Sequence, residues 1–266
     1  MIHPLVAPHA KAIVAALTTR VEGIGRIVLL GSASSGGEFD PETSDIDIAI
    51  LFDDKPHGKQ HAIAEAGNEL RRILPAMPQF SVLTTSQVER WRNFELCYEG
   101  QVAAGVVLFA DERKFDGLVL SRGEAKKEVI EQYIRQAKRW LSLARKDRTT
   151  TYIRFAEFES CRAVCRAFHA LLIRVDVDPS PKAIRWNLPS LMKLVAGHCA
   201  VPAVISTAAL SIPSDIKGNS RWTIEWIESP AADAVLQSRL AVVRAWRVIR
   251  WCVGQCKGEA NDLARA

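Results

Sequence analysis

The sequence predicts two domains of different class. An α/β domain with a small mixed sheet and helices is expected over residues 1–118, and an all-α helical bundle over residues 119–266. Two short apolar runs, Ile27–Leu30 and Ile46–Phe52, are typical of buried strands. Beyond residue 118 no strand-like alternation of any length follows, and apolar residues recur at helical spacing. Alternating strands and helices followed by helices alone indicate an α/β domain joined to a bundle.

The first domain is divided into elements by glycine, proline and small polar residues between its apolar segments. Thr85 or Ser86 is expected to cap the last long helix. We expect, in chain order, a helix over 4–20, a strand over 27–30, a short helical turn over 33–37, a strand over 46–52, a helix over 59–74, a strand over 79–84, a helix over 86–103 and a strand over 105–109.

The second domain shows helical spacing in four segments. Within 151–175 the apolar residues recur at intervals of three and four, which is the pattern of a bundle seam. The expected helices cover 122–146, 151–175, 188–195 and 231–255. The segment 201–229 is harder to interpret, because prolines interrupt it and Trp222 and Trp226 stand without a clear period.

Charge is distributed unevenly along the chain, although the net charge is only +5. Residues 1–120 contain 11 Lys and Arg against 16 Asp and Glu, whereas residues 121–266 contain 24 against 14. An acidic half beside a basic half is consistent with an anion held between them. Ordinary solvated helix faces would give the same imbalance.

No apolar run approaches the roughly 18 residues that a membrane span needs. The N-terminus lacks a basic segment followed by an apolar one, so we expect a cytoplasmic protein with no membrane partner.

Among the six cysteines, Cys161 and Cys165 together with His169 have the spacing of a zinc site. Buried thiols in a reducing compartment are the simpler interpretation.

The candidate functional residues begin at Gly31-Ser32, where the first expected strand ends. They continue with Asp45 and Asp47 around the start of the second expected strand. Side chains two apart on a strand point to the same face. Paired carboxylates repel each other unless a cation lies between them, and oxygen ligands of this kind suit Mg²⁺. A Gly-Ser turn can offer backbone N–H groups and a hydroxyl to phosphates.

This arrangement resembles the nucleotidyltransferase superfamily, the DNA polymerase beta-like group. The residues that match its pattern are Gly31, Ser32, Gly36 or Gly37, Ser44, Asp45 and Asp47. The sequence motif Gly-Ser-Ala-x-x-Gly-Gly … Ser-Asp-Ile-Asp also resembles that of the minimal and the streptomycin/spectinomycin (aminoglycoside) adenylyltransferases. The resemblance implies an enzyme that uses Mg²⁺ to transfer a nucleoside monophosphate, AMP from ATP being the expected case, to a hydroxyl group. The acceptor would be an aminoglycoside-like small molecule or a macromolecule such as a partner protein or an RNA end.

Gln79 departs from the family pattern, which usually has a third acidic residue on the third strand. Glutamine is neutral, so it binds Mg²⁺ less tightly than a carboxylate and cannot act as a base. Two carboxylates can still hold one metal, or Glu65 or Glu69 can substitute. A protein that binds a nucleotide without catalysis is the alternative function.

The helical half resembles the bundles attached to nucleotidyltransferases, including the HEPN group and the carboxy-terminal domain of aminoglycoside nucleotidyltransferases. The resemblance depends on Phe155-Ala156-Glu157, Arg166–Leu172 and Leu188–Leu191. Some HEPN proteins are ribonucleases with an Arg followed by a His, and Arg162 and His169 have that spacing. A HEPN-type ribonuclease or one half of a toxin–antitoxin pair is therefore a further alternative.

The adenylyltransferase interpretation assigns a role to each residue. Asp45 and Asp47 would bind the metal, while Gly31, Ser32, Gly36 and Ser44 would position the triphosphate. Glu157 or Glu159 is the candidate base for the acceptor hydroxyl, and Lys138, Arg139, Lys182 or Arg185 is the candidate for contacting phosphates. The substrate cleft is expected between the two domains, and a homodimer is one expectation for the assembly.

Overall fold

The computed structural model describes residues 2–35, 39–54, 57–111, 117–147, 153–179, 186–213 and 234–258. The chain divides into two compact units, Met1–Ala125 (unit 1) and Lys126–Ala266 (unit 2). Unit 1 contains the strands, and unit 2 is helical in the part of it that the structure describes. The predicted class, an α/β domain followed by a helical domain, is confirmed.

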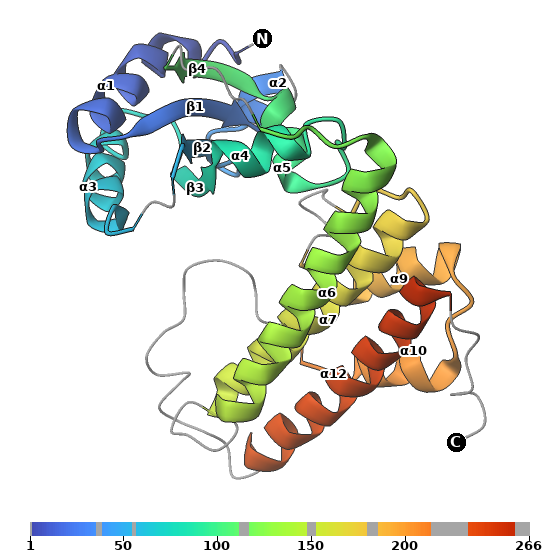
Figure 1. Ribbon diagram of the computed structural model, residues 1–266. Coiled ribbons are helices and arrows are strands. Elements are labelled where there is room, and N and C mark those ends of the chain that lie inside the picture. The colour runs from blue at the N-terminus through green and yellow to red at the C-terminus, as the bar shows by residue number, and fades with distance from the viewer. Residues whose placement is uncertain are drawn as a thin grey trace. The chain divides into compact units, whose positions relative to one another are not determined.

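Unit 1 is built on a four-stranded mixed sheet in the order β3-β2-β1-β4, with β4 and β3 at its two edges (Figure 1). The strands are β1 (Ile24–Leu30), β2 (Ile46–Phe52), β3 (Pro78–Thr84) and β4 (Val106–Ala110). β1 pairs antiparallel with β2 and β4, whereas β2 and β3 run parallel.

Helices cover both faces of this sheet. Alternate residues of the central strands, such as Ile46, Ile48 and Ile50, pack with α1 (Ala10–Arg20) and α3 (Gln60–Leu70). The intervening residues Ala49 and Leu51 pack on the other face with α4 (Thr85–Arg90) and α5 (Tyr98–Ala104). The central strands are therefore apolar on both faces, as expected for a sheet with two helical layers.

Three local predictions in unit 1 are wrong. The helix expected over 86–103 is two helices, α4 and α5, because Trp91, Phe94 and Cys97 between them turn inward and are buried. The cap is Thr84, neither Thr85 nor Ser86: its hydroxyl accepts the backbone N–H of Gln87 in a capping box. The helix expected over 4–20 begins instead with a short 3₁₀ turn, η1 (Ala7–His9), before α1.

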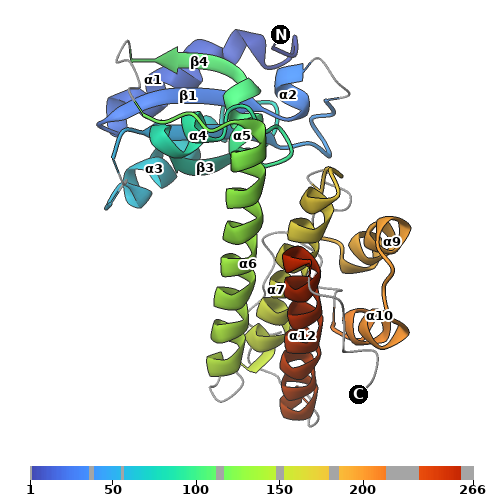
Figure 2. The ribbon, with the colours of Figure 1, turned by 45° about the vertical axis from the view of Figure 1, so that its right-hand side comes forward.

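Unit 2 places three long helices side by side: α6 (Arg122–Asp147), which begins in unit 1, α7 (Ile153–Arg174) and α12 (Ala234–Lys257) (Figure 2). Two shorter helices, α9 (Leu188–His198) and α10 (Ala203–Leu210), pack against them. These bounds lie within three residues of the helices expected over 122–146, 151–175, 188–195 and 231–255. Small residues such as Ala163, Ala167, Ala241 and Ala245 are fully buried where α7 meets α12, which permits close packing.

No helix in the described ranges is long and apolar enough to cross a membrane. Cys161, Cys165 and Cys252 are buried free thiols within the helical core. Trp222 and Trp226 lie outside the described residues.

Candidate active site

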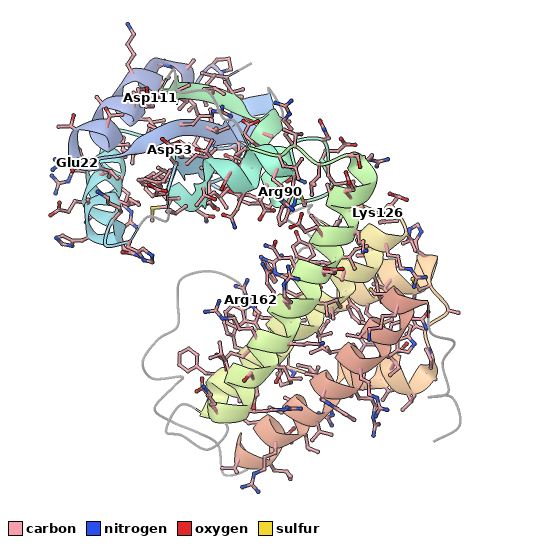
Figure 3. The ribbon with its side chains drawn as sticks, viewed as in Figure 1. Glu22, Asp53, Arg90, Asp111, Lys126 and Arg162 are labelled. Carbon is pink, nitrogen blue, oxygen red and sulfur yellow. The ribbon has the colours of Figure 1, made fainter. Side chains whose placement is uncertain are left out.

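The candidate site lies where the chain enters β2. Ser44 and Asp45 precede the strand, and Asp47 is its second residue, paired with Leu30 at the end of β1. Strand alternation directs Asp47 to the same face as Ala49 and Leu51, the face that α4 and α5 cover further along β2. Asp45 and Asp47 are half-buried and therefore reach solvent. Asp53, labelled in Figure 3, lies at the opposite end of β2. Its carboxylate accepts a hydrogen bond from the Thr85 hydroxyl.

Gly31 makes the sharp turn beside these carboxylates. Its φ is +64°, in the left-handed region that glycine adopts without strain. A Cβ atom built on Gly31 would lie 2.9 Å from the Asp47 Oδ2 atom. The missing side chain thus leaves room for backbone and carboxylate to approach each other. The four-residue helix α2 (Ser32–Ser35) follows, and Ser34 donates from its backbone N–H and its hydroxyl to the Gly31 carbonyl.

The loop between α2 and β2 is held by a compact turn over Asp40–Ser44. The Asp40 carboxylate accepts hydrogen bonds from the Thr43 hydroxyl and the Glu42 N–H, and these bonds lower its pKa. The Ser44 hydroxyl in turn accepts the Asp40 N–H, at 3.2 Å. Ser44 is therefore placed next to Asp45 with a structural role in the turn. Gly36 and Gly37 lie outside the described residues.

The N-terminal segment braces the same loop, which the sequence did not suggest. The His3 N–H donates to the carbonyl of the buried Ala33, and the His3 ring lies 5.1 Å from the Phe39 ring, centroid to centroid. Phe39 is 7% exposed. A histidine before a proline among apolar residues carries no local signal of such a contact.

Gln79 occupies the position beside the carboxylate pair. β3 is parallel to β2, and Gln79 is in register with Asp47. The Gln79 side-chain amide donates to the Asp45 Oδ2 atom at 2.8 Å, so a hydrogen bond joins β3 to the residue before β2. The amide therefore stands where a third carboxylate would otherwise face the pair.

The suggestion that Glu65 or Glu69 substitutes for this carboxylate is wrong. Both residues are on α3, which packs against the isoleucine face of the sheet, opposite to Asp47. Glu69 forms an ion pair with Arg20 at 2.7 Å, and Glu65 lies 3.3 Å from His61 on the same helix. Neither acid joins the candidate site.

The donor set at this site fits a hard divalent cation. Asp45 and Asp47 supply carboxylate oxygens, and the Gln79 amide has a carbonyl oxygen in addition to the N–H₂ group that binds Asp45. In the described part of the chain, no cluster of three or more His, Cys, Asp or Glu side chains is arranged to hold a metal. A cation here would therefore bind to two carboxylates and draw the rest of its shell from neutral oxygens.

The candidate bases of unit 2 are buried in the bundle. Glu157 on α7 is 9% exposed and accepts a hydrogen bond from the Ser238 hydroxyl of α12 at 3.1 Å. Glu159 is 7% exposed, and burial, together with the nearby Asp147 carboxylate, raises its pKa to about 7. A carboxyl group with a pKa near neutrality can exchange a proton at physiological pH.

Arg162 and His169 both lie against the Trp186 ring, but His169 is only 1% exposed. It lies between the Tyr133 and Trp186 rings, at centroid distances of 5.9 and 5.5 Å. A phosphodiester cannot reach a histidine enclosed in this way, so the ribonuclease interpretation lacks an accessible base here. Of the candidate phosphate contacts, Lys138 and Arg139 are exposed on α6, while Lys182 and Arg185 lie outside the described residues.

Comparison with known families identifies the class of unit 1. Residues 10–95 match the family described as nucleotidyltransferase domain, a span that includes the Gly31 turn, both carboxylates and Gln79. The match covers 86 of the 266 residues, and it supports nucleotidyl transfer as the class of activity for this part of the chain. No curated protein matches the chain.

Two solved structures show distant similarity. A HEPN domain protein from Thermotoga maritima is 18% identical, with a TM-score of 0.36, and the alignment covers 51% of this chain and 99% of that chain. A nucleotidyltransferase-like protein from Exiguobacterium sibiricum is 8% identical, with a TM-score of 0.38, and the alignment covers 94% of this chain and 78% of that chain.

Proposed function

We propose that the protein is a Mg²⁺-dependent adenylyltransferase that moves AMP from ATP to a hydroxyl group of a small molecule, aminoglycoside-like in type, or of a macromolecule. The observation that supports this most directly is the placement of the Asp47 carboxylate against the Gly31 turn, where its Oδ2 atom lies 2.9 Å from the position that a Cβ of residue 31 would occupy, with Asp45 two residues before it. Metal-binding carboxylates beside a phosphate-binding turn are the minimum that nucleotidyl transfer requires.

Asp45 and Asp47 would hold the metal. When bound, Mg²⁺ supplies a positive charge that offsets the negative charge of the phosphates as the reaction proceeds. The Gln79–Asp45 hydrogen bond fixes one Asp45 oxygen and so orients the other. This restraint means that the carboxylate needs little reorganisation when the metal and nucleotide arrive.

Gly31 and Ser32 would receive the triphosphate. Their backbone N–H groups lie where β1 ends, and a residue larger than glycine at position 31 would crowd Asp47. Ser44 can still donate its hydroxyl proton to a phosphate oxygen, because its oxygen is the acceptor in the bond from Asp40. Gly36 is proposed for the same role by the sequence pattern alone.

In the transfer itself, an acceptor oxygen forms a bond to the α-phosphorus while the bond from that phosphorus to the pyrophosphate leaving group breaks. The hydroxyl proton must go to a base, and Glu157 remains the candidate from the sequence. Its hydrogen bond to Ser238 would have to loosen for this role. We propose the cytoplasm as its compartment, since ATP and Mg²⁺ are available there, and a homodimer stays an expectation for its assembly.

Nucleotide binding without transfer is the second candidate, and Gln79 favours it. An amide in place of a carboxylate weakens the metal site and removes one potential base from it. The domain would then report on nucleotide levels instead of modifying an acceptor.

Incubation with ATP labelled at the α- or the γ-phosphate, Mg²⁺ and a panel of hydroxyl acceptors separates these candidates. Adenylyl transfer puts the α-label on the acceptor and leaves the γ-label in pyrophosphate. Asp45→Asn and Asp47→Asn should each abolish transfer with the fold intact, whereas Asp54→Asn, an exposed acid beyond the other end of β2, should retain it. Wild-type turnover in either site variant would show that the metal assignment is wrong, and binding without label transfer would support the second candidate.

A further inference from the structure

The N-terminal segment, residues 2–6, is tied by a hydrogen bond to the helical turn of the candidate active site. The His3 N–H donates to the Ala33 carbonyl at 2.9 Å. Ala33 belongs to α2 and is fully buried. Figures 1 and 2 both show the N-terminal segment next to α2. A residue distant in sequence therefore contacts the turn that directly follows Gly31.

His3 reaches a second point of the same loop through its side chain. Its ring lies 5.1 Å from the Phe39 ring, centroid to centroid, at an interplanar angle of 48°. Phe39 is buried in the core of unit 1. In the sequence, Ala33 and Phe39 stand on either side of Gly36 and Gly37, and glycine loses more conformational freedom on folding than any other residue. One residue thus contacts the chain both before and after this glycine pair.

His3 is itself held by its neighbours in the chain. Its carbonyl accepts the backbone N–H groups of Val6 and Ala7, both at 2.9 Å. Its ring Nδ1 atom accepts the N–H of Leu5 at 3.3 Å, which places the proton of the neutral ring on Nε2. Val6 is fully buried, and Ile2 packs against the core of the unit. The orientation of the ring is therefore set by a backbone hydrogen bond.

The helix α2 depends on contacts from outside itself. It is four residues long, well below the length at which a helix is stable alone. Ser34 ties it to Gly31, because its backbone N–H and its hydroxyl lie 3.0 and 2.9 Å from the Gly31 carbonyl oxygen. Gly31 in turn lies against the Asp47 carboxylate. A displacement of α2 would therefore be transmitted to the turn beside the candidate metal ligand.

We propose that His3 is a positioning residue of the candidate active site, which holds the Gly31–Ser35 turn in the shape that receives the phosphates of the nucleotide. The identity of the ligand rests on the proposed function. His3 acts through Ala33 and Phe39 and need not touch the nucleotide itself. A turn that is already ordered loses less conformational entropy when the ligand binds, so the loss of His3 weakens nucleotide binding by the folded protein.

Equilibrium binding of ATP in the presence of Mg²⁺ tests the role of the ring. His3→Ala removes the contact with Phe39 and should weaken ATP binding by about two- to tenfold, the range expected for a lost aromatic contact. His3→Phe keeps a ring against Phe39 and should recover most of that affinity. The matched control is His9→Ala, since His9 is a half-buried histidine of η1 whose side chain forms no cap hydrogen bond. Its affinity should equal that of the wild type.

Hydrogen exchange of the Ser34 amide tests the restraint without any nucleotide. This amide donates to the Gly31 carbonyl, so its exchange rate reports how often the turn opens. It should exchange about two- to tenfold faster in His3→Ala than in the wild type. The Leu17 amide in α1 should exchange at the wild-type rate. A purely structural role would instead lower the melting temperature and speed both amides, and would leave the ATP affinity of the folded protein unchanged.

The two measurements separate a failure of this proposal from a failure of the proposed function. If the wild type binds no ATP, the proposed function is wrong, and the Ser34 amide alone decides whether His3 restrains the turn. If the wild type binds ATP and His3→Ala binds it equally well, or if the Ser34 exchange rate does not change, His3 is not a positioning residue. His3→Phe binding no better than His3→Ala would overturn the role of the ring. Should His3→Ala not fold, Phe39→Leu makes the same comparison, because it removes the second ring and keeps a buried apolar side chain.

Discussion

Replacing Gln79 by Glu changes the charge of the candidate metal site without changing the length of the side chain. In the wild type the Gln79 amide donates to Asp45 Oδ2 at 2.8 Å. Gln79→Glu removes this donor and places a carboxylate against a carboxylate, so the metal-free protein should lose stability. Mg²⁺ should restore it, because a third carboxylate faces the cation.

The size of the effect follows from Coulomb's law. A unit charge about 4 Å from a divalent ion gains about 2 kcal/mol in a medium like water. Gln79 is exposed and Asp45 half-buried, so the high-dielectric value applies. Salt screening and partial protonation of the new carboxyl group reduce the gain to about 1–2 kcal/mol, which corresponds to roughly 5- to 30-fold tighter Mg²⁺ binding.

Calorimetric titration of Mg²⁺ into protein with a non-hydrolysable ATP analogue measures this difference. Ser81→Glu is the matched control, since Ser81 pairs with Ala49 two residues further along the same strand and face. Its affinity should stay near the wild-type value. A second readout is the melting temperature of Gln79→Glu, which should fall in EDTA and rise with Mg²⁺. Unchanged Mg²⁺ affinity in Gln79→Glu would place this residue away from the metal and refute the reasoning.

The other predictions concern a turn, a buried acid and the two units. Gly31→Ala should lose activity and about 1–2 kcal/mol of stability, because its φ of +64° is strained for alanine and the new Cβ meets Asp47. The control Gly23→Ala has a φ of +79° and open space around the new Cβ, so it should lose stability but keep activity. The contribution of Glu159 to folding stability is fully present below its unfolded pKa of 4.5 and is lost as the pH rises through its folded pKa of about 7. The free energy of unfolding of Glu159→Gln should therefore exceed that of the wild type by about 1–3 kcal/mol at pH 8 and equal it at pH 4. Urea unfolding at the two pH values measures this difference. A chain ending at residue 118 should bind ATP much more weakly than the full chain, because the acidic first half lacks the basic groups expected to complete the site; equal affinity would give the bundle another role.

Elements whose signal is local could be predicted from the sequence. The Ile46–Phe52 strand and the long helix beginning at Arg122 follow from apolar runs and helical spacing, and the structure has them at those positions. The break between α4 and α5 could not be predicted in this way. It depends on Trp91 and Phe94 entering the core, and a Cβ at Gly100 would clash with the Phe94 carbonyl oxygen. Such tertiary contacts override helix propensity.

The candidate site shows the same division. Asp45, Asp47 and Gly31 belong to one motif, so their proximity follows once β1 and β2 pair. The Gln79 hydrogen bond needs the parallel register of β3 against β2, which a single sequence does not specify. The brace of His3 on Phe39 and the two arginines on Trp186 join segments far apart in the chain, and no spacing rule anticipates them.

The central claim is that Asp45 and Asp47 form the metal and nucleotide site of a nucleotidyltransferase domain. Equilibrium binding of ATP, measured with Mg²⁺ and again with EDTA, tests it most directly in the wild type, Asp47→Asn and the control Asp54→Asn. We predict that tight binding needs Mg²⁺ and falls by about tenfold or more in Asp47→Asn only, since a hydrogen bond or contact to a charged group is worth about 1.5–3 kcal/mol. Equal ATP affinity in EDTA, or in Asp47→Asn, would contradict the account.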